Sequence, residues 1–219
     1  MATSIGSVTD ATPGAHGFDC NVPLTAATAK AMRQKGFDFC VRYLSRLAPE
    51  GGGDLSSAES KAILSGGLGL MAVQHVSRPH WVPNATLGEQ FGAGAAANAQ
   101  AIGLPQGLIL WLDLEGIKDG VAAGDVIAYC NAWFEKVEGA HYKTGVYVGA
   151  NCILSGEELF FRLTTQHYWR SGSHVPDIPQ RGYQMVQFIS PTPDVVNGIA
   201  IDRNVTMTDS FGGMVNWIK

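Results

Sequence analysis

The sequence lacks the features that mark several large protein classes. It has no cluster of Lys and Arg, and its formal net charge is −4 at pH 7, so nothing favours nucleic-acid binding. No apolar run approaches the roughly 20 residues that span a bilayer. The start of the chain has neither the basic residues nor the apolar segment of a secretory signal. We therefore expect a protein made in the cytoplasm, with no membrane span and no nucleic-acid partner.

Metal-binding and redox motifs are also missing. The cysteines (Cys20, Cys40, Cys130 and Cys152) are widely spaced, with no Cys-x-x-Cys pair, and the histidines show no ligand spacing. We expect four buried thiols, no metal and no cofactor. An alternative is that Cys20, directly after Asp19, is a nucleophile, although no Cys–His–Asn pattern accompanies it.

The most apolar stretch of the chain is Leu108–Glu115, which lies between two glycines. Such a run predicts a buried strand. Side chains alternate between the faces of a strand, so Trp111, Asp113 and Glu115 share one face. Carboxylates on a buried face are costly without a reason for being there. We predict that they lie at the mouth of a barrel and do acid–base work.

Strand and helix patterns alternate through the first two thirds of the chain. Strands are expected at 17–21, 37–44, 68–76, 108–115 and 144–148, with helices at 25–35, 56–66, 86–102, 122–137 and 155–165 after them. The motifs Ser56-x-x-Glu59, Thr86-x-x-Glu89 and Ser155-x-x-Glu158 predict capping boxes. Three further strands, at 167–170, 184–188 and 199–202, are separated only by loops.

This alternation predicts a parallel sheet. Eight strands in a chain of uniform composition favour one closed barrel over two domains. We predict an α/β fold: a flexible lead-in over residues 1–15, then a single TIM-like (β/α)-barrel over residues 16–219. It would have about five β/α units followed by three helix-poor strands.

In such a barrel, the C-terminal ends of the strands form the active face. The side chains expected there are the acids Asp19, Asp113, Glu115 and Asp202, with Arg42, Tyr43, Gln74, Tyr147, Trp169 and Gln187. Aromatic rings stack on sugars, amides pair with hydroxyl and N-acetyl groups, and paired carboxyl groups handle protonation and oxocarbenium charge. The combination therefore favours polysaccharide hydrolysis.

Each of these residues has a simpler explanation when taken alone. Asp19 could be a turn residue, Asp202 could pair with Arg203, and Trp169 could be plain core. Arg42, on an apolar strand, needs a partner, and we expect one of the site carboxylates to provide it. Their recurrence at successive strand ends favours the functional interpretation.

In chain order, Gly17-Phe-Asp19, Asp113-Leu-Glu115, Val186-Gln-Phe188 and Asp202 resemble glycoside hydrolase family 25, the lysozyme-type N-acetylmuramidases that cleave peptidoglycan. The chain is more similar still to a related glycoside-hydrolase-like group, whose second strand carries Arg-Tyr, here Arg42-Tyr43. The resemblance covers residues 16–205. It implies a barrel with five β/α units and three strands without helices.

The resemblance implies that Glu115 is the general acid. Asp113 would be its partner, either stabilising the transition state or orienting an N-acetyl group, and Asp19 and Asp202 would line the same cleft. Gln187, Tyr147 and Trp169 would bind sugar. Family 25 usually has other residues where this chain has Cys20-Asn-Val-Pro23, so the exact glycan stays open. Retaining, inverting and substrate-assisted mechanisms also stay open, and a degenerate barrel that only binds cell-wall glycan is the alternative.

The expected ligand is peptidoglycan or another N-acetylated polysaccharide, bound by a monomer. Without a signal peptide, the protein would reach the periplasm or the medium by non-classical or secretion-system export. This fits a phage lysis enzyme or an antibacterial effector, and the second would imply an immunity protein as partner.

Overall fold

The computed structural model describes residues 5–47, 53–190, 192 and 194–219. Residues 1–4 of the expected lead-in and 48–52 of a Gly-rich loop lie outside the described residues. Eight strands form a closed ring: β2 (His16–Asp19), β3 (Phe39–Leu44), β4 (Gly69–Gln74), β5 (Ile109–Leu114), β6 (Lys143–Val148), β7 (Tyr168–Arg170), β8 (Met185–Phe188) and β10 (Ile199–Thr206). The predicted single α/β barrel is confirmed.

The last strand of the barrel runs against its neighbours. Strands β2 to β8 are parallel, whereas β10 pairs antiparallel with both β8 and β2. The sheet is therefore mixed, not parallel as predicted. Strand β10 also continues past the predicted end at Asp202 to Thr206. Strand β10 begins at Ile199, and Asp202 lies at the barrel mouth because the pairing of β10 with β2 starts there, opposite Asp19 in register.

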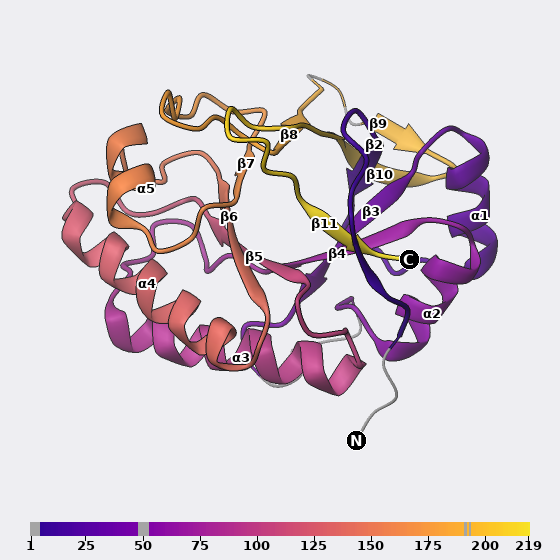
Figure 1. Ribbon diagram of the computed structural model, residues 1–219, viewed down its shortest axis with the longest axis horizontal. Helices are drawn as coiled ribbons and strands as arrows, with labels where there is room; N and C mark the ends of the chain where they lie inside the picture. The colour runs from indigo at the N-terminus through magenta and orange to yellow at the C-terminus, as the bar shows by residue number, and fades with distance from the viewer. Residues whose placement is uncertain (1–4, 48–52, 191, 193) are drawn as a thin grey trace.

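Helices follow the first five barrel strands and cover the outside of the barrel (Figure 1). They are α1 (Ala26–Gln34), α2 (Ser57–Ser65), α3 (Ala85–Ile102), α4 (Ala123–Gly139) and α5 (Gly156–Arg162). No described helix follows β7, β8 or β10, so the predicted five β/α units and three bare strands are confirmed. None of the helices in the described ranges has the length and apolarity to cross a membrane.

The predicted capping boxes have three different outcomes. At α5 both reciprocal hydrogen bonds between Ser155 and Glu158 form. At α2 the Ser56 hydroxyl accepts from the Glu59 N–H, but the Glu59 carboxylate binds other groups. At α3 the predicted box is wrong, because Asn84 is the N-cap and accepts from the N–H of Leu87 at 2.9 Å.

The end of the barrel opposite the mouth is closed by segments near the two chain ends. Strands β1 (Val8–Asp10) and β11 (Asn216–Ile218) pair antiparallel, and Ile218 joins β11 to β4 at Leu70. The Trp217 ring packs inside, 5.9 Å from the ring of Phe39. Where we expected a flexible lead-in over residues 1–15, the structure places 8–10 in a strand, because their backbone completes a ladder with β11. A short strand, β9 (Asp194–Val196), forms a hairpin with β10.

Candidate active site

Side-chain alternation decides which strand residues reach the barrel mouth. On β3 and β4, Tyr43 and Val73 point inward and line a cavity there. On β5, Trp111 fills the barrel interior and Asp113 lies one step closer to the mouth. The neighbouring side chains of Arg42 and Gln74 point outward, toward the helices. The same alternation brings residues from β6, β7, β8 and β10 to one place.

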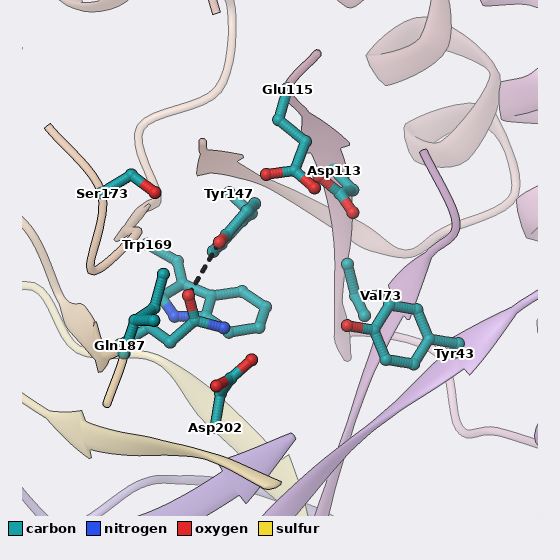
Figure 2. A pocket seen from close by; sticks show the side chains of 10 residues that line it. Tyr43, Val73, Asp113, Glu115, Tyr147, Trp169, Ser173, Gln187 and Asp202 are labelled. Carbon is teal, nitrogen blue, oxygen red and sulfur yellow. Dashed lines mark hydrogen bonds between the residues drawn. The ribbon is translucent and has the colours of Figure 1, made fainter. Parts of the chain in front are cut away.

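The mouth holds a cavity of about 190 Å³. Its lining comprises Tyr43, Val73, Asp113, Glu115, Tyr147, Trp169, Ser173, Gln187, Ile189 and Asp202. Figure 2 shows Glu115 and Asp113 on one side of it and Asp202 opposite, with Tyr147 and Trp169 between them. A groove of about 440 Å³ shares Tyr43 and Asp202 with the cavity and extends past Asp19, Asn21 and Asp194. Cavity and groove together form the cleft.

The Asp19 carboxylate is held at the end of β2 by donors from three strands. Its Oδ2 accepts from Gln187 Nε2 at 2.9 Å and from Asn204 Nδ2 at 2.8 Å, and its Oδ1 accepts from the Tyr43 hydroxyl at 3.3 Å. Burial nevertheless raises the pKa of Asp19 to about 6, and the charge of Asp202 adds to the rise.

The donors around Asp19 are themselves fixed by aromatic residues. The Tyr147 hydroxyl donates to Gln187 Oε1 at 2.8 Å, the hydrogen bond drawn in Figure 2. The Trp169 indole donates to Asn204 Oδ1 at 2.9 Å. Only 1% of Trp169 is exposed, so it supports the cleft floor and is not a stacking platform.

Asp113 and Glu115 lie at the same end of β5. Asp113 is buried, and its Oδ1 has no hydrogen-bond partner among the described residues. Burial, with the charges of Glu115 and Asp19, raises the pKa of Asp113 well above its usual range. Glu115 is half-buried, and its pKa is raised by burial and by Asp19 and Asp202. Both groups therefore hold their protons to a higher pH than ordinary carboxyl groups.

Two contacts fix the position of Glu115. The Trp81 indole donates to the Glu115 carbonyl at 2.8 Å. On the other side lies Gly149, where an added Cβ would come within 2.5 Å of both Cβ and Oε2 of Glu115. The glycine thus leaves space that the Glu115 carboxyl group fills.

Asp202, the fourth acid, lies where the cavity meets the groove. Its pKa is raised by partial burial and by the neighbouring charge of Asp194. The Asp194 carboxylate itself is paired with Arg203 at 2.5 Å. All four predicted acids thus line the cleft, although Asp202 comes from a strand that runs in the opposite direction.

Two predicted site residues do not reach the cleft. Arg42 was expected to pair with a site carboxylate, but its guanidinium pairs with Glu59 of α2 at 2.6 Å and also donates to the carbonyls of Cys20 and Gly53. The Gln74 side chain donates to the Phe91 carbonyl. Both predictions are wrong because successive side chains of a strand point to opposite faces. Arg42 precedes the inward-facing Tyr43, and Gln74 follows the inward-facing Val73, so both point outward.

The four cysteines are free and buried, as predicted. Burial raises the pKa of the Cys20 thiol, and its Sγ donates to the Val22 carbonyl at 3.4 Å. A protonated, hydrogen-bonded thiol is a poor nucleophile, so the Cys20 alternative has no support here. Within the described ranges, no three His, Cys, Asp or Glu side chains are arranged to hold a metal ion.

The sequence analysis missed several cleft residues. Asn204 follows Asp202 by two on one strand, so alternation would have identified it if the strand had been extended. Gly149 follows the strand residue Tyr147 by the same spacing. Ser173 and Ile189 lie in loops and carry no pattern that would have pointed to the cleft.

Solved structures with the same fold include proteins from bacteria and from a phage. The Tat-secreted protein Rv2525c of Mycobacterium tuberculosis, in complex with L-tartrate, is 18% identical, with 92% of this chain and 98% of that chain covered and a TM-score of 0.66. The bacterial lysozyme from Streptomyces coelicolor is 15% identical over 90% of this chain and 93% of that chain, with a TM-score of 0.60. The catalytic domain of endolysin ply40, from bacteriophage P40 of Listeria monocytogenes, is 15% identical over 90% and 95%, with a TM-score of 0.57.

A search of curated protein sequences gave no match. The family model described as "Rv2525c-like, glycoside hydrolase-like domain" matches residues 30–206, which is most of the chain and includes the acids Asp113, Glu115 and Asp202. The structural neighbours include lysozymes as well as Rv2525c, so the likeness to glycoside hydrolase family 25 noted in the sequence agrees with the fold. The chain belongs to the Rv2525c-like, glycoside hydrolase-like domain family.

Proposed function

We propose that this protein is a lysozyme-like glycoside hydrolase that cleaves peptidoglycan, with Glu115 as the general acid. The observation that carries the proposal is the position of Glu115. Its carboxyl group lies at the end of a buried strand and faces a cavity whose other charged lining groups, Asp113 and Asp202, are also acids. That surrounding raises the pKa of Glu115 above its ordinary value, which favours the protonated form that a general acid needs.

The same acids serve both halves of the reaction. Before bond cleavage, the charges of Asp19 and Asp202 favour the protonated form of Glu115. As Glu115 gives its proton to the glycosidic oxygen, positive charge develops at the anomeric carbon, and nearby carboxylates stabilise it. Asp113 is the partner of Glu115 in this scheme. Its raised pKa favours the protonated form, which can orient a substrate group, and a role through its charge requires that it lose this proton.

The remaining cleft residues would bind and orient sugar. Tyr43, Tyr147 and Gln187 line the cavity, and Trp169 supports them from below. The family membership and the lysozyme fold support a glycan substrate. Because the similar protein Rv2525c is Tat-secreted, we extend the proposal to action in the periplasm or outside the cell.

The proposal is tested by turbidity loss and release of reducing ends from purified cell walls. We expect Glu115→Gln to lower both rates by about 100-fold or more, since general acid catalysis contributes about 10²–10⁴-fold. Glu157→Gln, the same chemical change at an exposed position on α5, serves as the matched control and should leave the rates unchanged. Equal rates for wild type and Glu115→Gln would show that Glu115 is not the acid.

A glycan-binding module without activity is the alternative. Such modules use exposed aromatic rings, whereas Tyr147 and Trp169 are 7% and 1% exposed. The structure thus favours the enzyme. Wall binding by wild type without any release of reducing ends would favour the module.

A further inference from the structure

The cleft is lined by charged groups of one sign. Five acids face the cavity or the groove (Asp19, Asp113, Glu115, Asp194 and Asp202), and no Lys, Arg or His among the described residues lines either. Of these five acids, Asp194 alone has a cationic partner in the part of the chain that the structure describes, namely Arg203. The other ionisable groups that face the cleft are Tyr43, Tyr147 and Cys20, whose pKa values are all raised, so they are neutral at pH 7. Asp202, where cavity and groove meet, is therefore an acid of the cleft that no cation among the described residues offsets.

The cleft also offers hydrogen-bond acceptors in excess of donors. Oδ1 of the buried Asp113 has no partner among the described residues. No described residue donates to the carboxylate of Asp202, which stands where cavity and groove meet. A ligand that brings donors would satisfy both groups.

The donors nearest to these acceptors are already engaged. Gln187 Nε2 and Asn204 Nδ2 both donate to Asp19, and Asn204 also donates to the Asp202 carbonyl at 3.2 Å. The hydroxyl of Tyr43 donates to Asp19, and that of Tyr147 donates to Gln187. Beside Asp202, an acetamido carbonyl, which only accepts, would thus face a carboxylate where it needs a donor.

We propose that the cleft binds an amino sugar whose nitrogen is a free ammonium group, a de-N-acetylated hexosamine, next to Asp202. An ammonium group brings three donors and a positive charge, and carboxylate acceptors bind it more strongly than they bind a neutral amide. The inference rests on the proposed function and narrows it: the preferred wall glycan carries deacetylated residues.

The test compares a tetramer of glucosamine with a tetramer of N-acetylglucosamine by isothermal titration calorimetry. The protein is the Glu115→Gln variant, so that neither ligand is cleaved during the titration. In low salt at pH 7 we expect the glucosamine tetramer to bind at least tenfold more tightly. The advantage should shrink at high salt, because screening weakens interactions between partly exposed charges.

A second variant locates the binding. In the Glu115→Gln background, Asp202→Asn should remove most of the preference. Asp10→Asn removes the same charge at an exposed position on β1, at the closed end of the barrel, and should leave the preference intact. The salt dependence of the parent protein provides the same test if Asp202→Asn does not fold.

Equal or weaker binding of the glucosamine tetramer would overturn the inference. So would equally tight binding of spermine, since that would show a general attraction for polycations. The result is separable from the proposed function. A preference for the glucosamine tetramer without wall cleavage would support the proposed ammonium site and contradict the proposed enzyme. Wall cleavage without that preference would support the enzyme and contradict the ammonium site.

Discussion

Buried polar residues occur on both faces of the barrel strands, and the two faces differ in whether these residues have a full set of hydrogen-bond partners. On the outer face, Arg42 pairs with Glu59. The Glu59 carboxylate also accepts from the Leu24 N–H, and the guanidinium also donates to the Gly53 carbonyl. Gln74 likewise donates to a carbonyl and accepts from Trp133 at 2.7 Å. On the inner face, Asp113 has one oxygen atom without a hydrogen-bond partner among the described residues, and it lies near other acids.

The difference teaches how to separate structural from functional polar residues. A buried group whose partners are complete stabilises packing and has nothing left to offer a ligand. A buried carboxyl group among like charges costs free energy and marks a candidate functional site. Sequence position alone does not distinguish them, because Arg42 and Tyr43 are adjacent and face opposite ways.

The largest expected effect on stability comes from breaking the ion pair between Arg42 and Glu59 on the outer face. Arg42→Ala leaves the Glu59 carboxylate buried without its cation, and the free energy of unfolding should fall by about 3–5 kcal/mol. Urea denaturation measures the loss. The double variant Arg42→Met with Glu59→Leu should lose less than the sum of the two single changes. A loss below about 1 kcal/mol in Arg42→Ala would mean that the pair does not stabilise the fold.

The next effect is the pH dependence of stability that we expect from Asp19, on the inner face of the barrel. The pKa of Asp19 is about 6 in the folded protein against an ordinary value of 3.8. The folded state binds the proton more tightly, so this contribution to stability is complete below pH 4 and is lost as pH rises through 6. The loss amounts to about 3 kcal/mol. Denaturation of Asp19→Asn between pH 4 and pH 7.5 should lack this decline, while Asp10→Asn keeps it. Parallel curves for wild type and Asp19→Asn would contradict the assignment.

A smaller effect is expected from the space beside Glu115. In Gly149→Ala the new methyl group would displace the Glu115 carboxyl group, and we expect roughly tenfold slower wall cleavage, since small misplacements of reacting groups cost this much or more. The pH profile should shift along with the rate. At Gly139 in α4 no atom lies within 4 Å of an added Cβ, so Gly139→Ala is the control. Unchanged rate and profile in Gly149→Ala would show that the carboxyl group does not depend on this packing.

The smallest effect is expected at Trp81. Trp81→Phe keeps the ring packing against Tyr129 and removes the hydrogen bond to the Glu115 carbonyl, which is worth about 1 kcal/mol. We expect wall cleavage to fall a few-fold, with little change in melting temperature. A loss as large as that of Glu115→Gln would give Trp81 a more direct part in the reaction.

Much of the fold could be predicted because its signals are local. The apolar run of β5, the helix after each of the first five strands and the capping box at Ser155 follow from spacing alone. The direction of β10 and the pairing of β1 with β11 could not be predicted. They depend on strands distant in sequence, and short strands carry weak patterns.

The candidate site was predictable to a similar extent. Asp19, Asp113 and Glu115 were found because the C-terminal ends of parallel strands meet at one face of a barrel. Asp202 was placed at the same face on a wrong premise, since β10 is antiparallel and continues past it. The roles of Arg42 and Gln74 were misjudged because closeness to a strand end was used without the side-chain direction. Ser173 comes from a loop, where neither periodicity nor position indicates what it contacts.

The antiparallel β10 has a consequence for how the protein matures. Two of the hydrogen bonds to Asp19 come from Gln187 and Asn204. These residues follow Asp19 by 168 and 185 positions in the chain. Such distant contacts form late in folding. While the chain is being synthesised, its first strands can already pair, but the cleft has no floor until β8 and β10 leave the ribosome. An unfinished chain therefore has no assembled cleft, and the acids come together only when synthesis is nearly complete.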